Sequence, residues 1–227
     1  ANKVMVNSFE FKKDIKKEFG VDATCIYNPL NTNEILKLSK KKSRNFFLKK
    51  KSLKIINIGR YTEQKDQITL IKSLKLIEKN INFEAIIVGK GILKNRLSEK
   101  IKNFKLEKNI KLVNFLKNPY PIIKQSDLII LSSRYEGLPN ILLESLVLKK
   151  FIISSNCRTG PKEILNNGKG GFLFKVGDYR QLANKIIFFK KNRKKCQSMT
   201  LISYKNLYRF DMEKNLKKYY ELVEKYL

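Results

Sequence analysis

Two glutamates, Glu136 and Glu144, lie in the stretch SSRYEGLPNILLES, whose other residues favour a buried helix. Glu144 is the only charged residue between Ile141 and Leu148, a segment that is otherwise aliphatic apart from one serine. A helix that is apolar on most sides is normally buried, and a lone buried carboxylate is costly unless it has a partner. The partner of Glu144 is therefore either a cation of the chain, such as Arg134 or a nearby lysine, or a ligand.

The start of this helix offers a site for an anion. Gly137 favours a tight loop before the helix, and Pro139 is suited to the first helical position. The N–H groups of Asn140 and Ile141 then lack intrahelical acceptors and can bind anionic oxygens. Glu144 lies roughly 7 Å along the helix axis from this N-terminus. A carboxylate accepts well from a diol, so a nucleotide sugar, with ribose, diphosphate and sugar in that order, fits this arrangement.

Two cations, Arg60 and Lys65, lie in the turn GRYTEQKD, which directly follows the apolar run LKIINI. Ligands of open α/β sheets bind at the carboxyl ends of strands, where this turn is expected. Arg can grip a diphosphate as a fork and Lys as a point charge. In so basic a chain, two solvated surface cations explain the pattern equally well.

The turn VGKG, which begins at Val88 and contains Gly89, also follows an apolar run. A lone GxG is explained equally well by tight-turn geometry. The turn lacks the third glycine of a dinucleotide fingerprint and the GK[ST] of a P-loop, so NAD and ATP are not the leading ligands.

Short apolar runs alternate with amphipathic helical stretches along most of the chain. This alternation, with short connections, predicts a doubly wound parallel sheet of the α/β class. The expected strands are Leu53–Gly59, Phe83–Gly89, Ile110–Phe115, Asp127–Ser133, Phe151–Ser155 and Gly171–Phe174. The expected helices are 64–79, 93–104, 139–149 and 179–190, with two more toward the end of the chain and one within the first 20 residues.

The composition excludes several kinds of chemistry. The sequence has no histidine, which removes His-based triads and HExxH zinc sites, and its three cysteines are isolated, which predicts a reducing compartment. No apolar run approaches the ~18 residues of a membrane span. The net charge is +29, from 49 Lys and Arg against 20 Asp and Glu. This charge favours nucleic acid or an anionic membrane as a partner, but it is explained at least as well by a general abundance of Lys, Ile and Asn.

Taken in order, these motifs resemble the C-terminal half of the family 4 glycosyltransferases, which are retaining enzymes with the GT-B fold. The similarity is to bacterial transferases that build polysaccharides or lipid-linked oligosaccharides. It is carried by GRYTEQKD, VGKG, the E-x(7)-E pair of glutamates, SSNCRTGPKEIL, and GFLF with DYRQLANKI. It runs from about Leu53 to the end of the chain, and the first residues resemble the end of that family's N-terminal domain.

The resemblance implies catalytic roles for Arg60, Lys65 and Glu136. The two cations would hold the donor diphosphate and stabilise the charge of the leaving group, and Glu136 would contact the transferred sugar or the phosphate. Glu144 would bind the ribose diol, and the loop at Leu116 would lie beside the nucleotide base. The substrate-binding residues implied are Gly59, Gly89, Leu116, Gly137, Leu138, Pro139, Asn140, Ile141 and Glu144.

The donor that the resemblance implies is a UDP-sugar, whose hexose or N-acetylhexosamine is transferred with retention, without a metal or other cofactor and without a protein nucleophile. The acceptor, a lipid-linked or surface glycan, would bind a domain absent from this chain, so we expect weak donor binding and little turnover by the chain alone. The expected division is 1–31, the end of the acceptor domain; 32–52, a linker; 53–208, the donor domain; and 209–227, a helix returning to the acceptor domain. The expected location is the cytoplasm, with peripheral attachment to the inner face of the membrane.

Two other classes of function compete with this one. A basic nucleic-acid-binding α/β domain would use the +29 charge and would bind RNA or DNA with a steep salt dependence. A GT-B nucleotide-sugar epimerase would use a histidine, which this sequence lacks. The ordered set of motifs favours the glycosyltransferase over both alternatives, so we expect no nucleic-acid partner.

Overall fold

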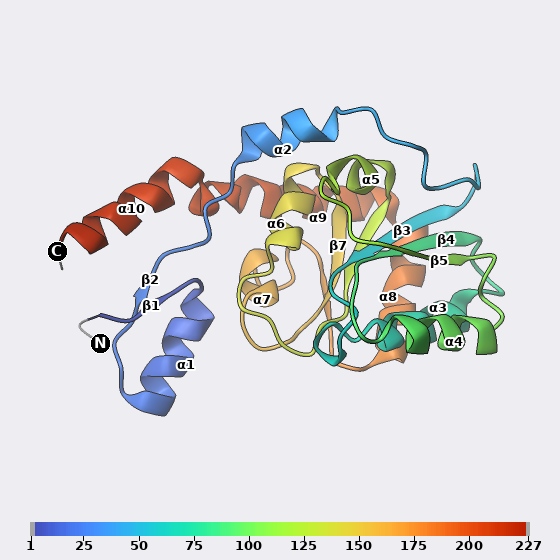
Figure 1. Cartoon of the computed structure of the whole chain (residues 1–227), viewed down its shortest axis with the longest axis horizontal. Helices are drawn as coiled ribbons and strands as arrows, with labels where there is room; N and C mark the ends of the chain where they lie inside the picture. Colours follow the sequence, from blue (N-terminus) through green and yellow to red (C-terminus); the bar gives the residue numbers. More distant parts are fainter. Residues whose placement is uncertain (1–2, 226–227) are drawn as a thin grey trace.

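The computed structural model describes residues 3–225. Six parallel strands form the main sheet in the order β5-β4-β3-β6-β7-β8, with helices on both faces (Figure 1). The predicted doubly wound α/β fold is confirmed. The strands are β3 Leu53–Ile58, β4 Phe83–Val88, β5 Ile110–Val113, β6 Leu128–Leu131, β7 Phe151–Ser155 and β8 Phe172–Phe174.

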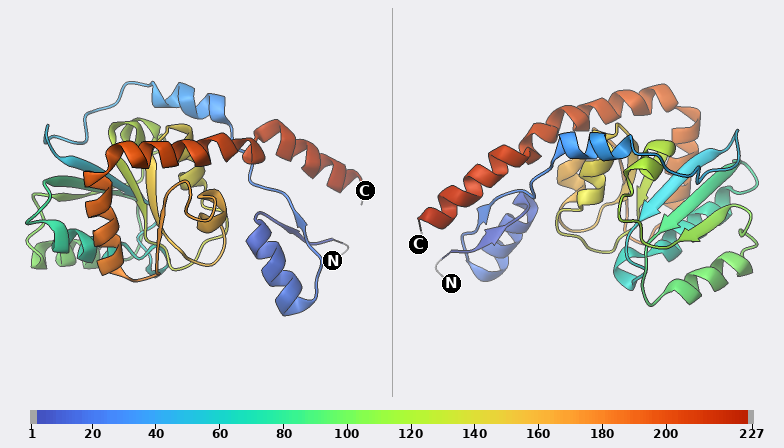
Figure 2. Two further views of the ribbon diagram at one scale, coloured as in Figure 1. Left: turned by 180° about the vertical axis from the view of Figure 1, so that it is seen from behind. Right: turned by 45° about the horizontal axis from the view of Figure 1, so that its top comes forward.

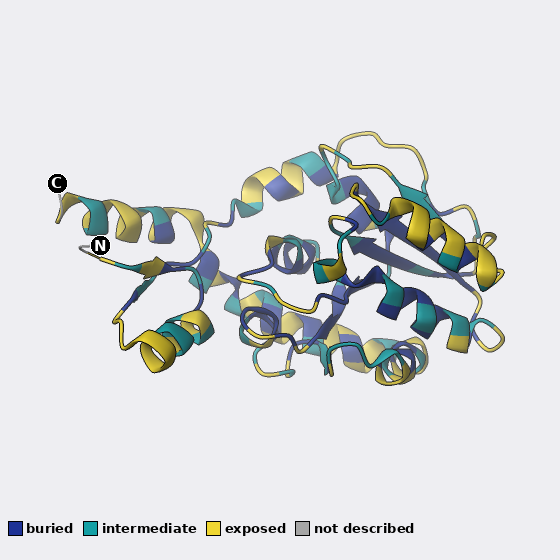
Figure 3. Ribbon diagram, turned by 60° about the horizontal axis from the view of Figure 1, so that its bottom comes forward, coloured by how far each residue is buried: buried dark blue, intermediate teal, exposed yellow. Residues whose placement is uncertain are grey.

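The sheet is buried on both faces, which is why its strands read as continuous apolar runs rather than alternating ones. Leu53 and Ile55 of β3 belong to one core, and Ile56 of the same strand belongs to the other. The first core includes α3 Gln67–Ile77, α4 Lys94–Asn103 and α8 Tyr179–Lys191. The second includes α2 Thr32–Ser39, α5 Tyr120–Gln125 and α6 Asn140–Val147. Figure 3 shows the buried sheet and the exposed outer sides of the helices.

The chain changes direction of winding between β3 and β6. It adds β4 and β5 on one side of β3 and then returns to place β6, β7 and β8 on the other. The last backbone pair between β3 and β6 joins Ile56 to Ile129, and the buried Asn57 amide donates to the Ile130 carbonyl at 2.8 Å beyond it. The turns after β3 and β6 therefore flank the switch point, where ligands of such sheets bind.

A smaller unit precedes the main domain. Strands β1 Met5–Val6 and β2 Thr24–Cys25 pair in parallel, joined by helix α1 Phe9–Phe19. The helix expected within the first 20 residues is α1, and Gly20 caps its end with a left-handed φ of 68°. The final helices, α9 Arg193–Lys205 and α10 Met212–Glu224, lead from the main domain to this unit, where α10 lies beside β1 and β2 (Figure 2).

Some expected elements differ in detail. The helix expected over 64–79 is divided: a 3-10 turn covers Glu63–Lys65, and α3 begins after Asp66, whose φ of 43° breaks the helix. Two short helices, α5 and α7 Pro161–Ile164, were not predicted. The predicted linker, residues 32–52, contains helix α2. The proposed division into domains stays a prediction. None of the helices within residues 3–225 has the length and apolar content needed to cross a membrane.

Candidate functional site

The glycine turns after β3 and β4 are packed tightly against each other. A Cβ atom at Gly89 would lie 2.0 Å from the Gly59 carbonyl oxygen, so only glycine allows this approach. Tyr61, fully buried, fills the space beneath, with its hydroxyl within 2.9 Å of the carbonyls of Ile87 and Val113. Gly89 thus has a packing role that does not require a ligand.

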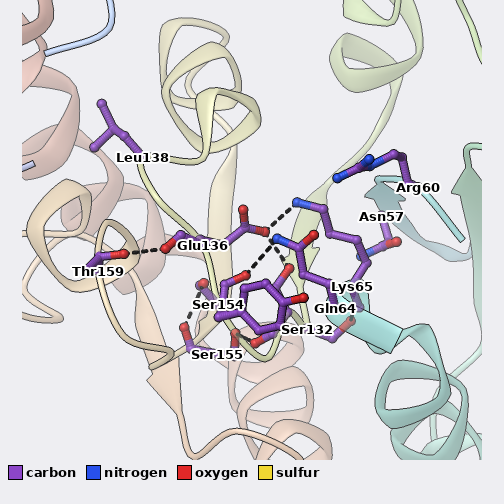
Figure 4. Close-up of polar contacts among 12 residues, drawn as sticks. Asn57, Arg60, Gln64, Lys65, Ser132, Glu136, Leu138, Ser154, Ser155 and Thr159 are labelled. Carbon is purple, nitrogen blue, oxygen red and sulfur yellow. Dashed lines mark hydrogen bonds and ion pairs between the residues drawn. The ribbon is translucent and has the colours of Figure 1, made fainter. Parts of the chain in front are cut away.

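The turn after β3 brings Lys65 to Glu136. Lys65 Nζ lies 2.6 Å from Glu136 Oε1, and the two side chains are only 17% and 8% exposed (Figure 4). Ser133 Oγ donates to the same carboxylate oxygen at 2.6 Å. A Cβ atom at Gly59 would lie 3.3 Å from carbons of the Lys65 side chain, so this glycine leaves room for the lysine to reach the glutamate. The two motifs that the sequence identified separately therefore form one site.

Asp66 fixes the turn that carries Lys65. Its carboxylate caps α3, accepting from the Thr69 N–H at 3.2 Å and from Thr69 Oγ1 at 2.9 Å. Arg134 lies 3.2 Å from the same carboxylate. The suggestion that Arg134 pairs with Glu144 is therefore wrong.

Arg60 is exposed and forms no ion pair within residues 3–225. Figure 4 shows it beside Lys65, with its guanidinium directed to the same side as the Lys65 amino group. Its backbone carbonyl accepts from Gln67 Nε2 at 2.9 Å, which fixes the turn but leaves the side chain available. Two adjacent cations, one of them held by Glu136, thus border the end of β3.

Glu144 is half-buried on α6 and has no cationic partner in the described part of the chain. Its one side-chain hydrogen bond is from the Tyr120 hydroxyl, at the long distance of 3.5 Å. Burial raises the pKa of Glu144, and the Tyr120 hydrogen bond opposes this only in part. Neither a lysine nor an arginine resolves the burial problem seen in the sequence, which leaves a ligand as the remaining candidate.

The other predicted substrate-binding residues divide into two kinds. The side chains of Leu138 and Pro139 are buried, so only their backbone can meet a ligand. Asn140 begins α6, and its side chain accepts from Asn28 Nδ2 at 2.8 Å. Gly137 and Ile141 remain accessible in part, as does Leu116 in the loop that leads from β5 to Tyr120.

Sequence reasoning missed three contributors to this site. Ser133 donates to the Glu136 carboxylate, and Tyr120 makes a long contact with Glu144. The Thr159 hydroxyl donates to the backbone carbonyl of Glu136, as Figure 4 shows. Thr159 lies inside the motif SSNCRTGPKEIL, and Ser133 lies three residues before Glu136, but no motif assigned either of them a role.

A cavity of about 200 Å³ opens beside Glu136, between α1 and the loops after β6 and β7. Its walls combine aromatic rings with charged groups. They include Phe11, Asp14, Glu18, Phe19, Tyr135 and Arg158. Within residues 3–225, no cluster of three or more Cys, Asp or Glu side chains is suited to hold a metal ion.

Comparison with known proteins places this geometry among sugar-transferring enzymes. The family described as "Glycosyl transferases group 1" matches residues 39–206, more than half of the chain. An uncharacterised glycosyltransferase of Methanocaldococcus jannaschii is 42% identical over 173 residues, which are 73% of this chain and 42% of that protein.

A second relative is a Campylobacter jejuni protein whose name is that of a 4-alpha-N-acetylgalactosaminyltransferase for a diphospho-undecaprenol-linked glycan. It is 26% identical to this chain over 179 residues, which are 78% of this chain and 47% of that protein. The chain thus spans less than half the length of these two relatives.

Solved structures of glycosyltransferases share the fold. Anabaena HepE in complex with UDP superposes with a TM-score of 0.84 at 19% identity, over 99% of this chain and 64% of that one. A Staphylococcus aureus TarM variant, also bound to UDP, gives 0.82 at 22% identity, over 97% of this chain and 43% of that one. These structural neighbours have the GT-B fold, which confirms the expected architecture.

Proposed function

The chain belongs to the group 1 glycosyltransferases, and from this premise we propose that it is the donor-binding portion of a retaining family 4 enzyme. In this proposal the enzyme transfers a hexose or N-acetylhexosamine from a UDP-sugar without a metal ion or other cofactor. The observation that carries the proposal is Glu144, a half-buried carboxylate with a raised pKa and no cation paired with it in the described residues. It lies on the helix that follows the loop of Glu136, the partner of Lys65.

The donor would lie across the switch point of the sheet. Arg60 and Lys65 hold the diphosphate, and Glu144 accepts from the ribose hydroxyls, which satisfies its charge without a counter-cation. An ammonium has three donors, so Lys65 can contact a phosphate oxygen while it keeps its 2.6 Å contact with Glu136. UDP in the solved structures of Anabaena HepE and of TarM supports uridine as the nucleoside.

The residues then divide the chemical work. Transfer breaks the bond between the anomeric carbon and the β-phosphate oxygen, and negative charge grows on the departing UDP. Arg60 and Lys65 stabilise that charge, the electrostatic work that a metal performs in other transferases. Glu136 lies at the sugar end. In front-face displacement the acceptor hydroxyl gives its proton to the departing phosphate, so retention needs no protein nucleophile.

The acceptor in this proposal is a lipid-linked or surface glycan. The name of the Campylobacter jejuni relative includes a diphospho-undecaprenol-linked glycan, and that of a Staphylococcus aureus relative names poly(ribitol-phosphate). Residues 1–31 would be the end of the acceptor domain, 32–52 a linker, 53–208 the donor domain and 209–227 the helix that returns. The enzyme would work in the cytoplasm at the inner face of the membrane, where its +29 charge favours anionic lipids rather than nucleic acid.

The test is calorimetric titration of UDP and UDP-N-acetylglucosamine into this chain. Glu144→Ala and Lys65→Ala should each weaken UDP binding by about ten- to a hundredfold, because each removes hydrogen bonds with a charged partner. Lys169→Ala, at an exposed position remote from the site, is the matched control and should bind like wild type. Absence of UDP binding, or wild-type binding by both site variants, would refute the proposal. Tight, steeply salt-dependent RNA binding would favour the nucleic-acid alternative instead.

A further inference from the structure

The last residue of β7 and the loop after it lie along the loop that carries Glu136 and contact it at three points. Ser155 Oγ donates to the Ser133 carbonyl at 2.6 Å. Arg158 pairs with Tyr135 as an isolated parallel bridge, and the Thr159 hydroxyl donates to the Glu136 carbonyl. The backbone around Glu136 is therefore shaped by this second loop.

The second loop has an unfavourable backbone conformation at Thr159. Its φ is 66°, in the left-handed region that a β-branched residue rarely occupies. Gly160 follows with a φ of 85°, and a Cβ atom there would lie 2.1 Å from the Gly137 carbonyl oxygen, so glycine is needed at that position. At Thr159 a glycine or asparagine would fit the backbone better. The threonine side chain must therefore contribute something that those residues would not.

That contribution concerns the peptide between Glu136 and Gly137. No cis peptide bond occurs in the described residues, so the carbonyl and the N–H of this peptide point in opposite directions. A hydroxyl that holds the carbonyl on one side therefore aims the Gly137 N–H to the other. Throughout residues 3–225, no carbonyl or side chain accepts a hydrogen bond from that N–H. It is available to an oxygen of a ligand beside Glu136.

Helix α1 fixes the loop after β7 from its far side. The Gly160 N–H donates to Glu10 Oε2 at 3.0 Å. Arg158 lies 2.7 Å from Asp14 and also pairs with Glu18. The loop is thus held between α1 and the candidate site, which limits how far Thr159 can move.

We propose that Thr159 is a positioning residue of the donor site, whose hydroxyl orients the Glu136–Gly137 peptide so that the Gly137 N–H meets an oxygen of the donor's β-phosphate or of the sugar attached to it. The inference rests on the proposed function. It assigns Thr159 no contact with the donor, because the residue acts through the peptide that it holds.

Three substitutions separate the hydroxyl from the shape and the backbone strain of Thr159. Thr159→Val keeps the shape without the hydroxyl, Thr159→Ser keeps the hydroxyl, and Thr159→Gly relaxes the backbone without it. Valine and glycine should weaken UDP-sugar binding about tenfold, the effect of one misplaced hydrogen bond, whereas serine should stay within about threefold. The melting temperature of Thr159→Gly should equal or exceed that of wild type, because glycine favours a positive φ.

Three ligands locate the affected contact by calorimetry. UMP lacks both candidate groups and should bind all variants equally. A loss that appears with UDP assigns the contact to the β-phosphate, and a loss that appears only with UDP-N-acetylglucosamine assigns it to the sugar. Wild-type affinity of Thr159→Val, an equal loss for UMP, or losses that follow the melting temperature would each overturn the inference. If wild type binds none of these ligands, the proposed function itself fails and this inference fails with it.

Discussion

Two glutamates at opposite ends of the sheet have opposite environments. Glu84, at the amino end of β4, is 1% exposed, yet it accepts hydrogen bonds from the Leu48 N–H at 2.7 Å, the Lys49 N–H at 3.0 Å and Lys111 Nζ at 2.9 Å. Glu144, above the carboxyl ends of the strands, has only the long contact with Tyr120. The protein supplies donors to the first carboxylate and very few to the second.

The pKa values of the two carboxyls differ in the same way. Burial alone would raise the pKa of Glu84, but the hydrogen bonds from the backbone and from Lys111 outweigh it, so the pKa lies below the usual range. Burial raises the pKa of Glu144, and one weak hydrogen bond does not offset it. A buried carboxylate that serves the fold is thus stabilised by the fold. One that is left short of donors marks a place where a ligand is expected.

Of the substitutions that test this comparison, we expect Glu84→Ala to have the largest effect on stability. Glu84→Ala leaves two backbone N–H groups and Lys111 without their acceptor, and we expect a loss of about 3 kcal/mol in the free energy of unfolding. Urea denaturation followed by circular dichroism measures it. Glu144→Ala, tested in parallel, should lose less than about 1 kcal/mol. Equal losses in the two variants would remove the distinction between a structural and a ligand-binding carboxylate.

The second prediction concerns pH and uses the charge-removing variants Glu84→Gln and Glu144→Gln. Because the pKa of Glu84 is lowered by folding, its charge stabilises the wild type above the unfolded-state pKa, and this is lost as the pH falls through the folded-state pKa. Because the pKa of Glu144 is raised, its contribution is full at low pH and is lost as the pH rises through the folded-state pKa.

As the pH rises through the lowered folded-state pKa of Glu84 to about pH 5, therefore, the stability of wild type relative to Glu84→Gln should rise and then level off. As the pH rises from about 4 to about 7, the stability of wild type relative to Glu144→Gln should fall. Denaturant titrations at a series of pH values give both slopes. Slopes of the same sign would show that the two sites do not differ as described.

The sequence drew attention to residues of the candidate site but not to the hydrogen bonds that residues 48 and 49 donate to Glu84. The apolar runs predicted the strands, and the pair of glutamates and the cations of GRYTEQKD drew attention to Glu136 and Lys65, which the structure brings into contact. Glu84 lay unnoticed within the strand run FEAIIVG, because its partners Leu48 and Lys49 are 36 and 35 residues away, in a segment expected to be a solvated linker. Contacts between distant segments leave no local pattern.

Two further features could not be predicted for a different reason. The break at Asp66 and the conformation of Thr159 both use positive φ values at residues other than glycine, 43° and 66°. Local preferences oppose such conformations, and specific side-chain contacts accompany them: the helix cap on Thr69 and the ion pair with the distant Arg134 at Asp66, and the hydrogen bond to the distant Glu136 carbonyl at Thr159. Sequence patterns report preferences, so they miss the places where packing overrides them.

The smallest effect on stability is expected for Lys111→Ala, which tests how much the ion pair with Glu84 contributes. Lys111 is the only cation that pairs with it within residues 3–225, but the lysine side chain is 41% exposed and its charge is screened by water. Lys111→Ala should therefore lose only about 0.5 kcal/mol in the free energy of unfolding, as for other exposed ion pairs. The loss should shrink further in 1 M salt, where the Debye length is about 3 Å. A loss close to that of Glu84→Ala in the same denaturation assay would mean that the ion pair, and not the backbone of residues 48 and 49, is what stabilises the buried carboxylate.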